Sequence, residues 1–261
     1  MPRHPGRVGT PPPRNLELEL RRALRPMLKS VRALVGSGRV RTEADARAVG
    51  AALRKAWPDK RIAAIVRAIA RKGEASASRP WGALARAEAK AKASAKTDAR
   101  MDAGEYDAEV VIEAWTRQAA KLITSVRDEV SDGLRRDIIE AARTGASAED
   151  LAGEWRREGI PLKFGTLEGR TKVIAQHQLS TLHAEVARAR ATAIGVEEFV
   201  WRSQGDARVR PSHRALDGRT FPYAAPPGSE GLPGTPVNCR CWAESVISDE
   251  LLGELGIEAI I

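Results

Sequence analysis

The chain has 261 residues, of which 43% are hydrophobic and 4% aromatic, and its formal net charge is +9. That length allows one large domain or two smaller ones, and the apolar content is sufficient for a core. No apolar run is long enough to cross a bilayer, and residues 1–10 do not form a signal peptide, so we expect a cytoplasmic protein without membrane contact. Two cysteines exclude the disulfide framework of small secreted proteins.

The positive charge is concentrated in the first part of the chain. Residues 1–100 contain 24 Lys and Arg against 8 Asp and Glu, a balance of +16, which leaves 19 against 26, or −7, for residues 101–261. This asymmetry predicts a polyanion or an acidic protein surface as partner of the first part, although charge that merely solvates alanine-rich helices remains an alternative. The candidate nucleic-acid contacts are Arg21, Arg22, Arg25, Lys29, Arg32, Arg54, Lys55, Arg67, Arg71 and Lys72.

The first hundred residues divide into a tail and a helical region. Residues 1–14 are rich in proline and arginine without periodicity, which predicts a basic tail that is disordered or extended. Residues 15–104 are predicted to be a basic helical region. Its first apolar positions, from Leu16 to Val35, recur at helical spacing, and Pro26 interrupts them, which predicts one kinked helix or two short ones.

Two further helices are predicted in this region. Thr42 and Asp45 form a capping-box pattern that begins the second helix. A third follows Asp59, and Gly73 is predicted to end it. Residues 73–104 lack a clear apolar stripe, so we expect an exposed helix or a linker there, with Trp81 anchoring a turn.

Residues 105–195 are predicted to be a region of long helices. An apolar stripe from Val110 to Ile138 indicates a helix that ends near residue 143. Ser147 with Asp150 begins a shorter helix, and another long helix is expected over 166–193. The fold class is therefore mainly α up to this point.

The segment 196–247 differs from everything before it and predicts a small α+β unit, followed by a C-terminal tail over 248–261. Short strands are expected over 198–203, 219–223 and 242–247, because aromatic and β-branched residues alternate there. Pro211 can open a short helix that carries His213. We expect the rings of Trp201, Phe221 and Trp242 to pack together across the strands, and the glycine- and proline-rich stretch 228–234 to be a flexible surface loop.

An ordered series of unusual residues spans this unit. It consists of Trp201, Asp206, Arg208, Arg210, His213, Leu216, Asp217, Gly218, Phe221, Pro236, Asn238, Cys239, Arg240 and Cys241. The series resembles the C-terminal signature of the phage Mu F-like head morphogenesis family, the minor head proteins of tailed phages. A short polar stretch at 175–178 matches a further family motif in part. The resemblance covers about the last third of the chain.

The resemblance implies a non-enzymatic virion protein that acts in capsid assembly or in handling packaged DNA. It implies the portal protein, capsid or scaffold proteins and packaged double-stranded DNA as partners. The implied location is the virion head near the portal vertex, with the host bacterial cytoplasm as the site of assembly. An active phage, a prophage remnant and a gene-transfer particle are all sources compatible with the resemblance.

The residues themselves leave the chemistry of the unit open. His213, Cys239 and Cys241 could supply three zinc ligands, with Asp206, Asp217 or water as the fourth. Their spacing matches no known zinc finger, however, and two cysteines two positions apart on a strand share a face where free thiols commonly pack. A bridge between them would be strained. We therefore favour packed thiols and expect no cofactor, with zinc as the alternative.

Two other functions remain alternatives. A metal-dependent nuclease, or a toxin-like effector packaged in the head, would use His213 with a metal ion. The second His or Asn that completes a His-Asn-His nuclease site is not found at helical spacing after His213, and no glycine-rich phosphate loop is present. A generic DNA-binding helical protein is the third interpretation.

Overall fold

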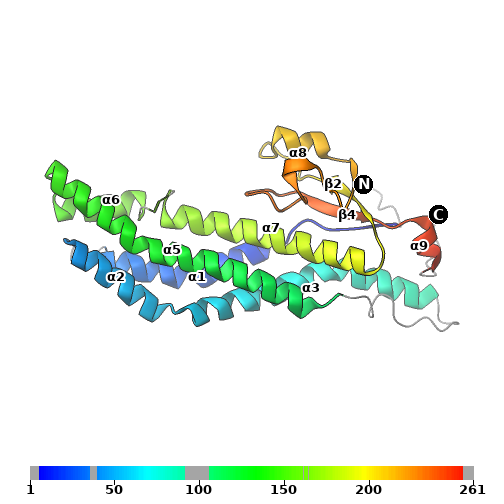
Figure 1. The fold of residues 1–261 in the computed structure, drawn as a ribbon, viewed down its shortest axis with the longest axis horizontal. Helices are drawn as coiled ribbons and strands as arrows, with labels where there is room; N and C mark the ends of the chain where they lie inside the picture. Colours follow the sequence, from blue (N-terminus) through cyan, green and yellow to red (C-terminus); the bar gives the residue numbers. More distant parts are fainter. Residues whose placement is uncertain (1–5, 36–39, 92–105, 161, 164, 255–261) are drawn as a thin grey trace. The chain divides into compact units, whose positions relative to one another are not determined.

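The computed structural model describes residues 6–35, 40–91, 106–160, 162–163 and 165–254 (Figure 1). It is mainly helical with a small antiparallel sheet near the C-terminus, which confirms the predicted fold class. The chain forms two compact units. The sheet unit comprises Met1–Arg14, Ala70–Glu113 and His177–Ile261, and the helical unit comprises Asn15–Ile69 and Ala114–Gln176. Three long helices contribute to both units.

Helix α1 (Arg14–Val35) shows how the helical unit obtains its core. Its buried side chains follow one another at intervals of three or four residues: Leu16, Leu20, Leu24, Met27, Val31 and Val35. Pro26 lies inside this single helix, so the alternative of two short helices is wrong. The burial continues on both sides of the proline, and this packing offsets the hydrogen bond that proline cannot donate.

Helices α2 (Glu43–Ala56) and α6 (Ala148–Glu158) both begin at the predicted capping boxes. The Asp45 N–H donates to the Thr42 side chain at 3.2 Å, and the Asp45 carboxylate accepts the Thr42 N–H at 2.8 Å. Ser147 and Asp150 repeat this exchange at the start of α6. Each box satisfies N–H groups that a first helical turn leaves without intrahelical partners.

Helix α3 (Asp59–Ala91) runs through Gly73, so the predicted helix end at that glycine is wrong. A glycine inside a helix costs only about 1 kcal/mol. Ala77 and Trp81 lie beyond it and are buried at 3% exposure each, and their packing favours continuation of the helix. Trp81 is part of the sheet unit's core, so it does not anchor a turn. Residues 92–104 of the predicted linker lie outside the described residues.

The two long helices of the central region are confirmed as α5 (Ala108–Thr144) and α7 (Leu167–Ala193). Within the helical unit, α5 carries Arg127, whose side chain is 4% exposed. Its guanidinium donates to the Trp57 carbonyl and to the Asp59 carboxylate, both at 2.7 Å. This buried cation therefore fixes the corner where α2 ends and α3 begins.

The sheet contains β1 (Arg7–Val8), β2 (Glu198–Arg202), β3 (Thr220–Pro222) and β4 (Trp242–Val246), in the order β1-β4-β2-β3. The three strands predicted near the C-terminus are confirmed. Of the two predictions for the tail, disordered or extended, the extended one holds at β1, which pairs antiparallel with β4. Backbone hydrogen bonding to a strand more than two hundred residues away leaves no periodic signal in the tail itself. Residues 1–5 lie outside the described part.

The strand register decides which aromatic rings meet. Phe199 and Trp201 project to one face of the sheet, where Trp201 is opposite Ala243. Trp242 is opposite Arg202, so its ring lies on the other face, and the predicted packing of Trp242 with Trp201 is wrong. Phe199 instead contacts the rings of Phe221 and Tyr223, with centroids 6.0 and 4.9 Å apart.

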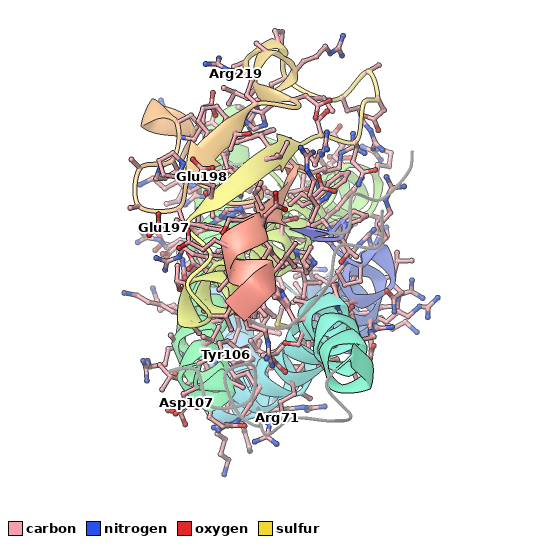
Figure 2. All side chains as sticks on the ribbon, turned by 90° about the vertical axis from the view of Figure 1, so that its right-hand side faces the viewer. Arg71, Tyr106, Asp107, Glu197, Glu198 and Arg219 are labelled. Carbon is pink, nitrogen blue, oxygen red and sulfur yellow. The ribbon has the colours of Figure 1, made fainter. Side chains whose placement is uncertain are left out.

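A polar network joins α3 to α7 inside the sheet unit. The Tyr106 hydroxyl donates to the Glu74 carboxylate at 2.9 Å, and Arg190 donates to Glu74 at 3.2 Å and to the Ser78 hydroxyl at 2.6 Å. The Arg190 guanidinium also lies 4.1 Å from the centre of the Tyr106 ring. Tyr106 is labelled in Figure 2. Burial, followed by the Glu74 carboxylate, raises the pKa of Tyr106.

Helix α9 (Asp249–Glu254) ends the described chain. None of the helices within the described residues is both long and apolar enough to span a membrane.

The close approach of β1 to β4 requires glycine at position 9. A Cβ atom there would lie 2.5 Å from the Ala243 carbonyl oxygen and 2.8 Å from the Glu244 Cα. We expect Gly9→Ala to displace β1 and to lower the free energy of unfolding by about 1 to 3 kcal/mol, the range for overpacking. Denaturant unfolding measures the loss. Gly205→Ala would be a poor control because φ is 69° there, whereas Gly153→Ala on α6 adds the same group inside a helix, where it meets only the guanidinium of Arg157, and should not destabilise. Equal effects of the two variants would contradict the steric argument.

Candidate functional site

The family-like motif begins where β2 turns into α8 (Pro211–Leu216). Pro211 occupies the first turn, as predicted. Asp217 ends the helix, and its carboxylate accepts the Ser203 N–H at 2.9 Å. Gly218 has φ 81°, a conformation that favours glycine, and its N–H donates to the Trp201 carbonyl at 2.9 Å. These motif residues therefore close the loop that holds α8 against β2.

Charged motif residues connect this loop to the segment before β4. The Asp206 carboxylate accepts a hydrogen bond from Arg240 and, at 3.0 Å, from the Arg208 N–H. The Arg240 hydrogen bond holds the pKa of Asp206 below its usual value. Arg210 donates to the Val237 carbonyl, and Asn238 adopts φ 60° directly before Cys239. Asp206 is therefore engaged by arginines and is not in the group of residues that could share a metal.

His213, Cys239 and Cys241 come together although 26 residues separate the histidine from the first cysteine. The His213 Nδ1 atom lies 3.4 Å from the Cys239 Sγ and 3.5 Å from the Cys241 Sγ. The three residues are 2%, 3% and 1% exposed, and both cysteines are free thiols. Their potential ligand atoms all lie within 4.8 Å of one another, which is the geometry of a small metal-binding cluster.

Two neighbours orient the histidine ring. The Glu230 carboxylate lies 2.8 Å from His213 Nε2, and the Trp201 ring packs edge-on against the imidazole with centroids 5.2 Å apart. Glu230 belongs to a short 3-10 turn, η1 (Gly228–Glu230), inside the stretch predicted to be a flexible surface loop. Sequence reasoning missed Glu230, because a single acid among glycines and prolines carries no periodic or spacing signal.

The Cys239 sulfur has the surroundings of an anionic group. It accepts hydrogen bonds from the backbone N–H groups of Gly234, at 3.3 Å, and Cys241, at 3.4 Å. The Cys241 thiol, followed by these N–H groups and His213, lowers the pKa of Cys239 to about 6, although burial acts in the opposite direction. The same pairing raises the pKa of Cys241. The two effects are opposite, so the pair favours negative charge on Cys239 rather than on Cys241.

The candidate nucleic-acid contacts do not form one surface of one unit. Arg71 and Lys72 belong to the sheet unit, and the others belong to the helical unit. Several already have ion pairs: Arg21 with Glu17, Arg32 with Glu168, Arg54 with Asp128, and Arg71 with Glu109.

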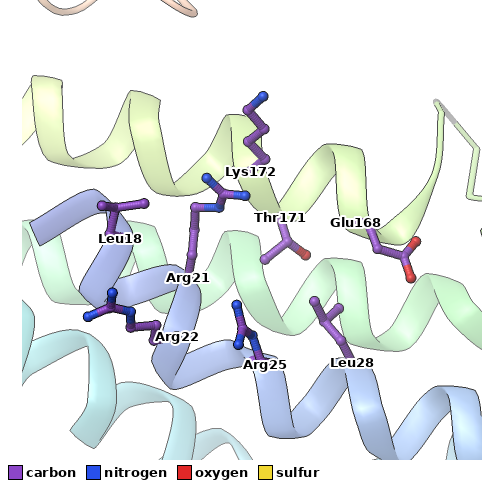
Figure 3. A pocket seen from close by; sticks show the side chains of 8 residues that line it. All are labelled: Leu18, Arg21, Arg22, Arg25, Leu28, Glu168, Thr171 and Lys172. Carbon is purple, nitrogen blue, oxygen red and sulfur yellow. The ribbon is translucent and has the colours of Figure 1, made fainter. Parts of the chain in front are cut away.

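A basic pocket of about 280 Å³ lies between α1 and α7 in the helical unit (Figure 3). It is lined by Leu18, Arg21, Arg22, Arg25, Leu28, Glu168, Thr171 and Lys172. Arg22, Arg25 and Lys172 are exposed. Lys172 was not among the predicted contacts, because α7 brings it beside α1 only in the folded unit.

Comparisons with known proteins agree with the motif. Residues 132–244 match the family described as Phage Mu protein F like protein, and this range contains the end of α5, helices α6 to α8, strands β2 and β3 and the start of β4. An uncharacterized protein of Haemophilus influenzae is 35% identical over 130 residues, which cover 50% of this chain and 28% of that protein. The chain thus spans less than a third of the relative's length. No solved structure matches the chain. Residues 132–244 are therefore a phage Mu protein F-like region, which confirms the family resemblance predicted from the C-terminal motif.

Proposed function

We propose that this protein is a minor head protein of a tailed phage and acts in head morphogenesis. The observation that supports it most is the family match over residues 132–244, which contains all the residues of the predicted motif. In the structure, hydrogen bonds connect several of these residues to one another around α8 and the start of β4. Because the motif residues are present and contact one another, we infer that this region acts in head morphogenesis.

We further propose the portal protein, with capsid or scaffold proteins, as the contact that brings the protein into the head near the portal vertex during assembly in the host cytoplasm. The test is to assemble heads in cells that express the full chain together with the portal, scaffold and capsid proteins of the same phage. Mass spectrometry of the purified heads then measures how many copies of this protein each head contains. We expect a few copies per head, and loss of the protein from heads assembled without portal. Its absence from complete heads would contradict the proposal, and equal amounts without portal would refute the portal contact.

The basic pocket supports packaged DNA as a further contact. Arg22, Arg25 and Lys172 place exposed cations around one concave surface, and each can bind a phosphate group. Phosphate contacts release counterions, so each contributes about 0.9 to the slope of log affinity against log salt concentration. The contact should therefore depend strongly on salt and little on base sequence.

We expect the triple variant Arg22→Gln, Arg25→Gln, Lys172→Gln to bind duplex DNA more weakly, with a salt slope shallower by up to about 3. Titration of a fluorescent duplex at several salt concentrations measures this. Substitution is preferable to removing residues 1–72, since that segment includes β1 and much of the helical unit.

A second triple variant, Arg136→Gln, Arg157→Gln, Lys121→Gln, makes the same change in net charge on exposed residues of the same unit away from the pocket. Its salt slope should stay close to that of the unmodified chain. Equal slopes for all three proteins, or no binding by any of them, would remove DNA as a partner of this pocket.

We infer that the protein is not an enzyme. His213 and Cys239 are 2% and 3% exposed, and a nucleophile at that depth is poorly placed to reach a phosphodiester or a protein substrate. The alternative of a packaged nuclease or toxin-like effector predicts cleavage of plasmid DNA in the presence of magnesium or zinc. We expect the plasmid to remain intact, and cleavage that disappears in His213→Ala would support the nuclease.

A further inference from the structure

We propose that His213, Cys239 and Cys241 bind one zinc ion, which joins α8 to the segment before β4 and stabilises the sheet unit. The proposal does not depend on the function in head assembly. It differs from the packed-thiol interpretation of the sequence, which used the spacing of the residues alone.

The ligand atoms already have the separation that zinc requires. Zinc binds sulfur at about 2.3 Å and imidazole nitrogen at about 2.0 Å, so a tetrahedral ion places an N and an S ligand about 3.5 Å apart. The observed distances from His213 Nδ1 to the two sulfur atoms are 3.4 and 3.5 Å. Nδ1 and both sulfurs face one another, so binding needs no rearrangement of the chain.

The surroundings match those of metal-bound ligands. A histidine that binds a metal through one ring nitrogen usually donates its other N–H to a carboxylate, and Glu230 lies 2.8 Å from Nε2. That contact places the proton on Nε2 and leaves the Nδ1 lone pair directed at the thiols. Packed, neutral thiols would not require an acid behind the histidine.

The backbone around the sulfurs favours charged thiolates. Two N–H groups donate to the Cys239 Sγ, at 3.3 and 3.4 Å. The indole Nε1 of Trp201, whose ring packs against His213, is buried without a hydrogen-bond partner among the described residues. Donors directed at buried sulfur stabilise negative charge there, and a bound cation compensates that charge.

Zinc is the ion that fits this donor set. Two thiolates and one imidazole suit zinc, whereas magnesium and calcium require oxygen ligands. The cluster supplies three protein ligands, so water in the fourth position would complete the tetrahedron. The ion would link α8 directly to the segment before β4, which is separated from α8 in sequence by β3 and η1.

The first test is the metal content of the full chain purified without chelator. We expect about one equivalent of zinc per chain, by elemental analysis that also measures iron, copper and nickel. Removal by chelator should lower the melting temperature, and zinc but not magnesium should restore it. A cobalt-substituted protein should show thiolate-to-cobalt charge-transfer absorption, which is weaker in Cys241→Ser. Absence of zinc, or zinc that stays bound in both His213→Ala and Cys239→Ser, would overturn the proposal.

Ligand variants can fail to fold for other reasons, so a second variant targets the residue behind the histidine. Glu230→Gln should keep the one-to-one stoichiometry but weaken zinc binding 10- to 100-fold, measured by competition with a chromophoric chelator. Glu244→Gln is the matched control, because Glu244 pairs with Arg202 on β2 and does not contact the cluster. Unchanged affinity in Glu230→Gln, or equal loss in both variants, would refute the role assigned to Glu230, whereas absence of zinc from the unmodified chain would refute the site itself.

Discussion

Replacing Trp201 by alanine is expected to lower the free energy of unfolding by about 3 to 5 kcal/mol, the range for large aromatic truncations in cores. The Trp201 side chain is 0% exposed and lies within the core of the sheet unit. Its ring also packs against His213. Alanine would therefore leave a cavity beneath α8 and remove the support of the imidazole.

The matched control for Trp201→Ala is Trp242→Ala, on the neighbouring strand. Trp242 is only partly buried and lies on the opposite face of the sheet, so the same change should cost far less. Denaturant unfolding at constant zinc concentration compares the two variants, and several probes are needed because the chain contains two compact units. Equal losses of unfolding free energy in the two variants would contradict the assignment of the two rings to opposite faces of the sheet.

The stability of the sheet unit should fall as the pH is lowered from about 6.5 to about 4, because of His183. This histidine is 5% exposed on α7, and burial lowers its pKa from 6.5 to about 4. Its Nε2 atom lies 3.5 Å from the Thr10 hydroxyl, which cannot compensate a charge. Between these pH values the unfolded chain binds a proton that the folded chain does not, so folding is disfavoured. This difference in pKa between the unfolded and folded chain corresponds to about 3 kcal/mol of folding stability, and the loss is complete below pH 4.

Comparison with His183→Leu isolates this contribution, because other titrating groups affect both proteins alike. We expect the variant to lose about 3 kcal/mol less than the unmodified chain between pH 7 and pH 4. His177→Leu serves as control: burial also lowers the pKa of His177, but this residue is only half-buried, so the change should be smaller. Parallel pH profiles of the unmodified chain and His183→Leu would show that His183 does not titrate as burial requires.

Local sequence patterns predicted most of the elements. The successful predictions used signals between residues that are close in sequence. These signals were the capping boxes at Thr42 and Ser147, the apolar stripes along α1 and α5, and the alternation in β2, and none of them requires knowledge of the tertiary structure. Gly73 was misread because propensity is weak compared with tertiary packing, which Trp81 provides beyond it.

The candidate site was predicted only as a set of residue types. The sequence named His213 and both cysteines as ligands, but their approach depends on the turn between β2 and β3, which no spacing rule describes. Glu230 and β1 were missed for the same reason, since each is defined by a contact with a distant segment. The side of the sheet on which Trp242 lies depends on the pairing register of β4, which also is not encoded locally.

The pairing of β1 with β4 also has a consequence during synthesis. Arg7 pairs with Val246, and these residues are 239 positions apart (246 − 7). At about 5 to 20 residues per second, a ribosome needs about 12 to 48 s to pass from one to the other. The first strand must therefore wait, outside the ribosome, until β4 has been translated before the sheet can close. A nascent chain that stalls before residue 242 would leave both β1 and one edge of β2 unpaired, and such open edges are the places where chaperones and other chains bind.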